Sequence, residues 1–131
     1  MRGSDLMLGD WVYLSDVAKY PMQVTLIDEG GCYLNFEGNE GDPFEGDFDD
    51  ESGVCPIELR DDLLLLNKFD NAGEGVFALP GHPDFRIRKI GDNLVLCVGK
   101  KKLAILRYVH QLQHLLRFIG EYRAANHFQV C

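Results

Sequence analysis

Two histidines near the C-terminal end, His110 and His114, lie four residues apart and share one face if the segment is helical. Two imidazoles at this spacing are able to bind zinc, with Glu121 as the best third ligand. The segment lacks the glutamate after the first histidine that makes an H-E-x-x-H helix catalytic. A polar helix face that hydrogen-bonds neighbouring loops is the other interpretation, and we favour it.

A second candidate cation site lies in an acidic, glycine-rich segment. Asp47, Asp49 and Glu51 alternate, and Glu58 follows eleven residues after Asp47. Alternating oxygen ligands with a distal glutamate are typical of a calcium loop. However, Ser52 stands where such a loop needs glycine, and the flanks read as strands rather than helices. We therefore favour a solvated loop that shields a sheet edge.

Two further sets of residues are candidates for interaction. Phe44 and Phe48 alternate with carboxylates in the acidic segment, and we expect them to fold back onto the sheet, with docking on a partner as the alternative. A basic set falls on one predicted meander, where a charged solvent face or a seat for the acidic segment is favoured over a patch for phosphate or nucleic acid. This set comprises Arg86, Arg88, Lys89, Lys100, Lys101 and Lys102.

Motifs for catalysis and for cofactor binding are missing from the sequence. It contains no P-loop, no G-x-G-x-x-G and no G-x-S-x-G elbow. The four cysteines, Cys32, Cys55, Cys97 and Cys131, form no C-x-x-C pair. We expect the first three to be small buried side chains in a reducing compartment and Cys131 to be exposed. The sequence therefore predicts no catalytic residue and no cofactor.

Length and charge limit the classes of protein to which the chain can belong. The 131 residues are enough for one domain with a real core. The net charge is −8, but residues 1–85 carry 4 Lys/Arg against 19 Asp/Glu, and residues 86–131 carry 9 against 2. We interpret this asymmetry as two halves that face each other in one fold or across a dimer. Nucleic acid is not the expected partner, because an acidic chain repels it at long range.

The sequence gives no sign of a membrane or secretory segment. No apolar run approaches the ~20 residues that span a bilayer, and the N-terminal residues lack the apolar core of a signal peptide. Provided that no signal has been removed, we expect a cytoplasmic protein that does not associate with membranes.

The elements that position these residues follow from turn signals and side-chain alternation. In the first 60 residues we expect four short strands, at residues 10–14, 22–27, 32–36 and 54–59, and a long exposed loop over residues 37–53. A short helix is predicted to begin at Asp61 and to run through Leu66. A polar loop over residues 70–75 then leads into a meander with strands at residues 76–79, 85–88, 94–98 and 103–106.

Residues 108–119 give the clearest pattern in the chain, that of an amphipathic helix with one buried stripe. Histidine, glutamine and arginine take the opposite side. We expect this helix to pack on the meander, Gly120 to end it and residues 121–131 to form a tail. The apolar stripe consists of Tyr108, Val109, Leu112, Leu115, Leu116 and Ile119.

The run Gly9-Asp10-Trp11-Val12, which follows a predicted turn, resembles the start of SH3-like small barrels. This resemblance covers about the first 60 residues and implies a barrel half, but no particular function.

Four motifs together resemble a family of small uncharacterised proteins from gut anaerobes that are often encoded near phage or mobile elements. The match spans most of residues 6–120, and the chain departs from the family in its acidic loop, at His114 and after Gly120. The family has no established activity, so the resemblance implies a fold without a function. The motifs are Gly9-Asp10-Trp11-Val12, Pro56-Ile57-Glu58-Leu59, Leu63 to Phe69, and the run from Arg107 to Gln113.

The sequence as a whole predicts an α+β fold: an N-terminal SH3-like small β-barrel half, then an antiparallel β-meander with one closing C-terminal helix. We expect a single domain over residues 1–131, with subregions 1–60 and 61–131. The favoured function is a non-enzymatic accessory or interaction module of a mobile element, with a protein partner or self-association. The alternatives are a metal-binding protein, through the histidine pair or the loop 42–58, and a nucleic-acid-related protein. The latter would bind through residues 86–102 or mimic DNA through residues 28–62.

Overall fold

The computed structural model describes residues 3–49 and 53–130. The chain forms two compact units, each built on a five-stranded antiparallel sheet. Unit 1 comprises Met1–Ile57 and Tyr108–His127, and unit 2 comprises Glu58–Arg107 and Phe128–Cys131. The predicted α+β class is confirmed, whereas a single domain over the whole chain stays a prediction. No helix among the described residues has the length and apolar character to traverse a lipid bilayer.

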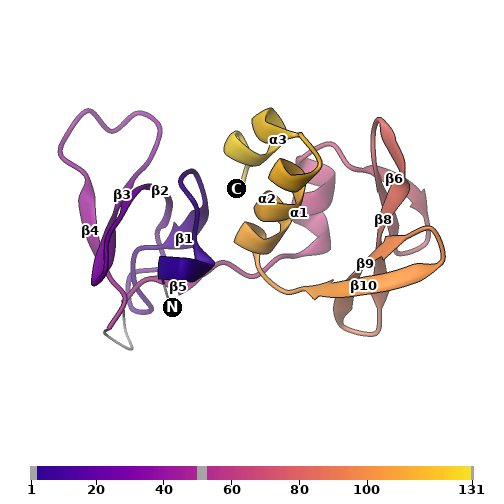
Figure 1. The fold of residues 1–131 in the computed structure, drawn as a ribbon, viewed down its shortest axis with the longest axis horizontal. Helices are drawn as coiled ribbons and strands as arrows, with labels where there is room; N and C mark the ends of the chain where they lie inside the picture. Colours follow the sequence, from indigo (N-terminus) through magenta and orange to yellow (C-terminus); the bar gives the residue numbers. More distant parts are fainter. Residues whose placement is uncertain (1–2, 50–52, 131) are drawn as a thin grey trace. The chain divides into compact units, whose positions relative to one another are not determined.

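Unit 1 is a curled sheet with strand order β4-β3-β2-β1-β5, so that the last strand returns to pair with the first (Figure 1). This curled, open sheet confirms the predicted barrel half. The chain then comes back after unit 2 to add two helices. The elements are the 3₁₀ turn η1 (Gly3–Asp5), β1 (Trp11–Tyr13), β2 (Pro21–Ile27), β3 (Gly31–Asn35), β4 (Phe44–Asp47), β5 (Cys55–Pro56), α2 (Val109–Phe118) and α3 (Tyr122–Asn126).

The core of unit 1 follows from alternation along its strands. Residues that are two apart on β2 and on β3 point to the same side of the sheet. On β2 the buried pair is Met22 and Val24, and on β3 it is Cys32 and Leu34. Val12, which is fully buried on β1, joins this cluster. One face of the sheet therefore carries the core.

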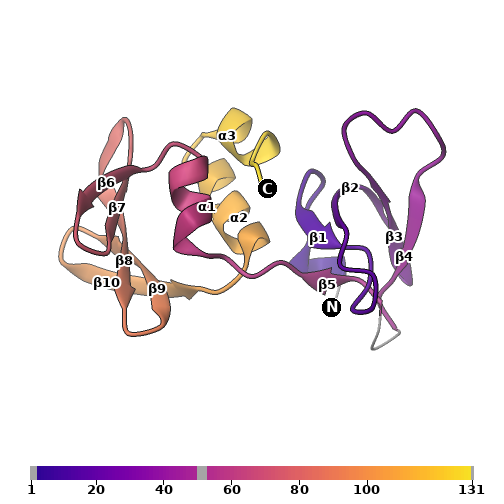
Figure 2. The same ribbon diagram turned by 180° about the vertical axis from the view of Figure 1, so that it is seen from behind.

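Unit 2 is a simple meander with strand order β10-β9-β8-β7-β6, preceded by a short helix (Figure 2). The register pairs Phe77 with Ile87 and Ile87 with Leu96 across three neighbouring strands. All three side chains are buried on this face of the sheet, and the central strand β9 also buries Val95 and Cys97 on the other face. The elements are α1 (Asp61–Leu66), β6 (Asp70–Gly73), β7 (Val76–Leu79), β8 (His82–Ile90), β9 (Asn93–Val98) and β10 (Lys101–Leu106).

Two strands lie where the sequence predicted loops. β4 falls within the predicted loop 37–53, and β6 within the predicted loop 70–75. Both are edge strands that are held by backbone pairing with β3 and with β7. The four residues of β6 are all exposed, and the inward position of β4 is Gly46. Neither strand therefore needs the apolar alternation on which the predictions relied.

The end of the chain also differs from expectation. Within the predicted tail over residues 121–131, Tyr122–Asn126 form α3. The amphipathic helix exists as α2, but the structure groups it with unit 1, where it contacts β1. Its first turn is fixed by Val109, whose N–H donates to the Ile57 carbonyl at 2.8 Å.

The close approach of β3 and β4 generates a prediction about stability. In the Gly31→Ala variant the added Cβ would overlap the Gly46 carbonyl oxygen, which is backbone and has little room to move. We expect unit 1 to lose about 1–3 kcal/mol of unfolding free energy. Urea unfolding followed by the fluorescence of Trp11, the single tryptophan, measures this loss.

The matched control is Gly30→Ala at the neighbouring position. An added Cβ there has no atom within 4 Å, so its midpoint should stay close to that of the wild type. Equal midpoints for the two variants would contradict this account of the β3–β4 pair.

Candidate functional site

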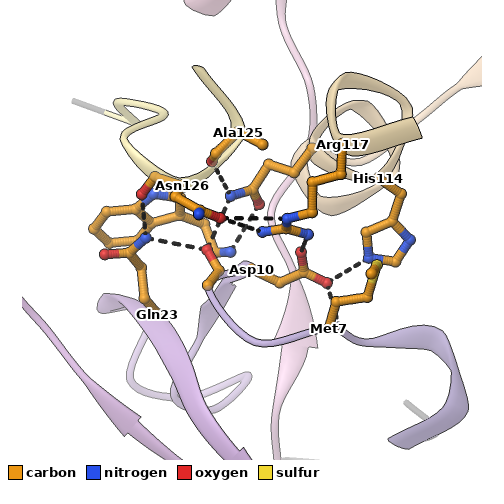
Figure 3. Close-up of polar contacts among 10 residues, drawn as sticks. Met7, Asp10, Gln23, His114, Arg117, Ala125 and Asn126 are labelled. Carbon is orange, nitrogen blue, oxygen red and sulfur yellow. Dashed lines mark hydrogen bonds and ion pairs between the residues drawn. The ribbon is translucent and has the colours of Figure 1, made fainter. Parts of the chain in front are cut away.

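A fully buried carboxylate, Asp10, lies directly before β1. Its Oδ2 accepts the Met7 N–H at 2.8 Å and contacts His114 Nε2 at 2.5 Å. Its Oδ1 accepts Arg117 Nη1–H at 2.6 Å. Figure 3 shows Asp10 between the side chains of Arg117 and His114. A buried carboxylate is costly unless it is paired and hydrogen-bonded, and these three donors meet that requirement.

Gln113, on α2, is the second polar side chain of this site that is fully buried. Its Oε1 accepts the Trp11 N–H at 2.9 Å. Its Nε2 donates to the Gly9 carbonyl at 3.0 Å and to the Ala125 carbonyl at 2.9 Å. The side-chain amide of Gln113 therefore links α2 to the start of β1 and to α3, through hydrogen bonds of both its oxygen and its nitrogen.

Gly9 is required at the centre of this network for two reasons. Its φ is +89°, which other residues adopt only with strain. An added Cβ would also lie 3.1 Å from both Arg117 Nη2 and Asn126 Oδ1. Its carbonyl accepts a second amide, because Gln23 Nε2 donates to it at 3.0 Å and to the Asn126 carbonyl at 2.8 Å (Figure 3). These hydrogen bonds therefore join the run Gly9-Asp10-Trp11-Val12 to the run from Arg107 to Gln113, which includes the start of α2.

An open pocket of about 800 Å³ lies beside α2 in unit 1. The rings of Tyr108 and His110 stack along it, with centroids 5.8 Å apart and planes at 8°. His114 meets His110 edge-on, at 5.6 Å and 69°. The pocket is lined by Ser4, Asp5, Phe48, Asp49, Val54, Cys55, Pro56, Tyr108, His110, Gln111 and His114.

His110 is the unusual member of this lining. It is 6% exposed, and its Nδ1 has no hydrogen-bond partner among the described residues. Burial lowers the pKa of His110, an effect that the nearby Asp10 carboxylate opposes and His114 reinforces. The ring is therefore neutral near pH 7, with one donor and one acceptor nitrogen.

The Asp10–His114 pair resembles the carboxylate–imidazole pair of a general base. Two observations set it apart from nucleophilic catalysis. Arg117 shares the same carboxylate, and burial, reinforced by Asp16, raises the pKa of the Cys55 thiol in the pocket. A thiolate at Cys55 is therefore disfavoured. The arrangement is better suited to holding a ligand between rings and carboxylates.

The metal candidates are only partly brought together. His110 and His114 lie side by side, whereas Glu121, which precedes α3, does not line the pocket. Within residues 3–49 and 53–130, no three His, Cys, Asp or Glu side chains form a group that could hold a metal ion. Among the described residues, the histidine pair therefore has no third side chain placed to bind the same metal ion.

The calcium candidates are dispersed along the chain. Asp47 ends β4, and its Oδ1 accepts the Asp49 N–H at 2.8 Å. Asp49 lines the pocket, Glu51 lies outside the described residues, and Glu58 belongs to unit 2. The segment thus begins as a strand, and the use of its acids as cation ligands stays a prediction.

The two phenylalanines of the acidic segment fold back onto unit 1. Phe48 packs against the core cluster, and Phe44 stacks on Phe36 with centroids 6.4 Å apart. Phe44 remains 41% exposed. Their use in docking a partner stays a prediction.

The basic candidates are divided by the strand register. Arg86 and Lys102 both lie opposite Cys97, so these three share one face of the meander. Lys89 instead donates to Asp61 Oδ2 at 3.2 Å, and it holds the pKa of that carboxyl below its usual range. Lys100 lies in the turn between β9 and β10, and Lys101 is the first residue of β10.

Sequence reasoning missed the residues that organise the site, namely Asp10, Arg117 and Asn126. The helix pattern placed Arg117 and Gln113 on a polar back, whereas both are buried. The sequence does place an acid, Asp10, next to an apolar strand. A buried acid needs a basic partner, so this position could have predicted an ion pair.

No family model, curated protein or solved structure matches this chain.

The Gln113 bonds generate a prediction about unit 1. The Gln113→Leu variant removes the partner of the Trp11 N–H and one partner each of the Gly9 and Ala125 carbonyls. We expect a loss of about 2–5 kcal/mol in unfolding free energy, because buried groups left unpaired are costly. Gln111→Leu, on the same helix, removes the bond from the Tyr108 N–H and should cost less. A larger loss for Gln111→Leu in urea unfolding would refute this ranking.

The pKa of His110 generates a prediction about pH. Its ordinary value of 6.5 is lowered in the folded state, so below about pH 6.5 the unfolded chain binds a proton that the folded chain resists. We expect His110 to make unit 1 less stable as the pH falls from about 7 to about 5. His110→Phe, which keeps a ring beside Tyr108, should flatten this dependence. Identical stability–pH slopes for variant and wild type would show that His110 is not the cause.

Proposed function

We propose that this chain is a non-enzymatic interaction module whose unit 1 binds a lysine or arginine side chain of a protein partner in the pocket beside α2. The observation that carries the proposal is the lining of this pocket. It combines the stacked rings of Tyr108 and His110 with the carboxylates of Asp5 and Asp49.

The charge of unit 1 supports a cationic ligand. The unit carries 4 Lys and Arg residues against 14 Asp and Glu residues, a balance of −10. One of those few cations, Arg117, is buried against Asp10. A field of this sign steers cations toward the surface and raises their rate of association.

The chemistry of the lining also supports a ligand that is rich in donors. Ammonium and guanidinium groups carry only donors, whereas carboxylates and the neutral His110 ring offer acceptors. The faces of aromatic rings such as Tyr108 attract a cation by about 0.5–2 kcal/mol. Acceptors and rings around one open pocket therefore complement a Lys or Arg side chain.

The alternative functions predicted from the sequence require different features of the protein. A DNA mimic needs only dense negative charge, so its binding would not depend on the pocket. A metal-binding protein needs a third ligand beside His110 and His114. The resemblance to the mobile-element family stays a prediction and names no partner.

Titration of the ¹⁵N-labelled protein with a short arginine-containing peptide tests the proposal, with the citrulline peptide as its uncharged counterpart. We expect amide shifts at Tyr108 and Asp49 that the citrulline peptide does not cause. Asp49→Asn should weaken binding about tenfold, which corresponds to about 1.4 kcal/mol.

The matched control is Asp42→Asn, which removes the same charge from the exposed acidic segment at a position outside the pocket lining. Equal weakening by Asp42→Asn and Asp49→Asn would point to a diffuse acidic surface and count against the pocket. Equal binding of both peptides would exclude a cationic ligand.

A further inference from the structure

Unit 2 carries a basic face that the sequence alone does not define. Arg86, Cys97 and Lys102 lie opposite one another on β8, β9 and β10, and Arg88 follows two residues after Arg86. Residues at these positions point to the same side of a sheet. The basic face is therefore Arg86, Arg88 and Lys102, which surround the buried Val95 and Cys97 of β9 on the side opposite to Phe77, Ile87 and Leu96.

The charges of the basic face have no acidic partner among the residues that the structure describes. Elsewhere in unit 2, Arg60 pairs with Asp62 and Lys89 pairs with Asp61. Arg88 and Lys102 are exposed, and Arg86 is half-buried. Ile105, which lies beside this face and is opposite Val95, is 42% exposed. The face thus combines unpaired cations with an exposed apolar side chain.

Unit 1 carries a face of complementary character. Glu45 lies opposite Tyr33, Tyr33 lies opposite Leu26, and Asp47 follows Glu45 at the next position on the same side. Tyr33 and Leu26 are 37% and 47% exposed. A hollow of about 460 Å³ at this face is lined by Asp28, Tyr33, Glu45 and Asp47, among others. We call Glu45, Asp47, Tyr33 and Leu26 the acidic face.

We infer that the basic face of one copy of the chain docks on the acidic face of a second copy. Both faces place two like charges at alternate positions of one strand, so Arg86/Arg88 and Glu45/Asp47 share a spacing of about 7 Å. Two parallel ion pairs therefore form in register, with Ile105 meeting Tyr33 and Leu26. The pocket residues Asp49 and Tyr108 are not part of either face, although the Asp49 N–H donates to Asp47 Oδ1.

A second copy suits the basic face better than nucleic acid does. The whole chain has a net charge of −8, which repels a polyanion at long range. A protein surface with a few acids around apolar side chains avoids that repulsion, and every copy presents one. Reciprocal docking gives a closed dimer, and head-to-tail docking gives an open chain of copies.

Sedimentation equilibrium at increasing concentration tests the inference. We expect the average mass to rise with concentration at about 50 mM salt and to return to that of the monomer at about 500 mM, because exposed ion pairs are screened. Arg86→Glu/Arg88→Glu alone, or Glu45→Lys/Asp47→Lys alone, should remain monomeric. An equimolar mixture of the two variants should associate again, because each supplies the face that the other has lost.

The control is Lys68→Glu/Arg123→Glu, which lowers the net charge as much as Arg86→Glu/Arg88→Glu does, at exposed residues outside both faces, and it should associate like the wild type. Unchanged far-ultraviolet circular dichroism shows that each variant is folded. A monomeric wild type at low salt, or a mixture that fails to associate, would overturn the inference. A gel shift of single-stranded DNA that only Arg86→Glu/Arg88→Glu abolishes would assign the face to a polyanion instead.

Discussion

The buried charge of Asp10 is the constraint on which unit 1 depends. A carboxylate with no exposed surface requires donors, and here they come from the chain just before β1 and from α2. Arg117 in turn donates to Asn126 of α3 at 3.3 Å. Satisfying one charge therefore fixes the positions of the N-terminal segment and both C-terminal helices. The same requirement orients His114 and so shapes one wall of the pocket.

The parts of the fold that were predictable are those with a periodic apolar signal. Alternation marks Met22 and Val24, and helical spacing marks Val109, Leu112 and Leu116, because burial at those positions leaves a repeat in the sequence. The edge strands β4 and β6 leave none, since backbone pairing tolerates exposed or glycine residues. The site was less predictable still. In the sequence, polar residues on one side of a helix have the same spacing whether they face water or bind buried backbone groups. Gln113 is of the second kind.

The acidic and basic residues acquire separate meanings once the register is known. The sequence showed two oppositely charged halves, and the strands divide them further. Lys89 joins Asp61 on one side of the meander, while Arg86, Arg88 and Lys102 gather on the other. In unit 1, Asp10 is neutralised internally, Asp49 lines the pocket, and Glu45 with Asp47 forms a face. Net charge alone therefore does not distinguish a buried acid that is paired inside the unit, an acid that lines the pocket and acids on the surface of a strand.

The discontinuity of unit 1 has a consequence for biosynthesis. Its sheet is complete by Ile57, yet Arg117 and His114, which contact Asp10, and Gln113, which donates to Gly9, lie on a segment that begins at Tyr108. As the chain leaves the ribosome, residues 58–107 emerge between the two parts. During that interval the Asp10 carboxylate has neither Arg117 nor His114, so it must stay hydrated. The final packing of unit 1 is therefore a late event of synthesis, which follows the emergence of almost all of unit 2.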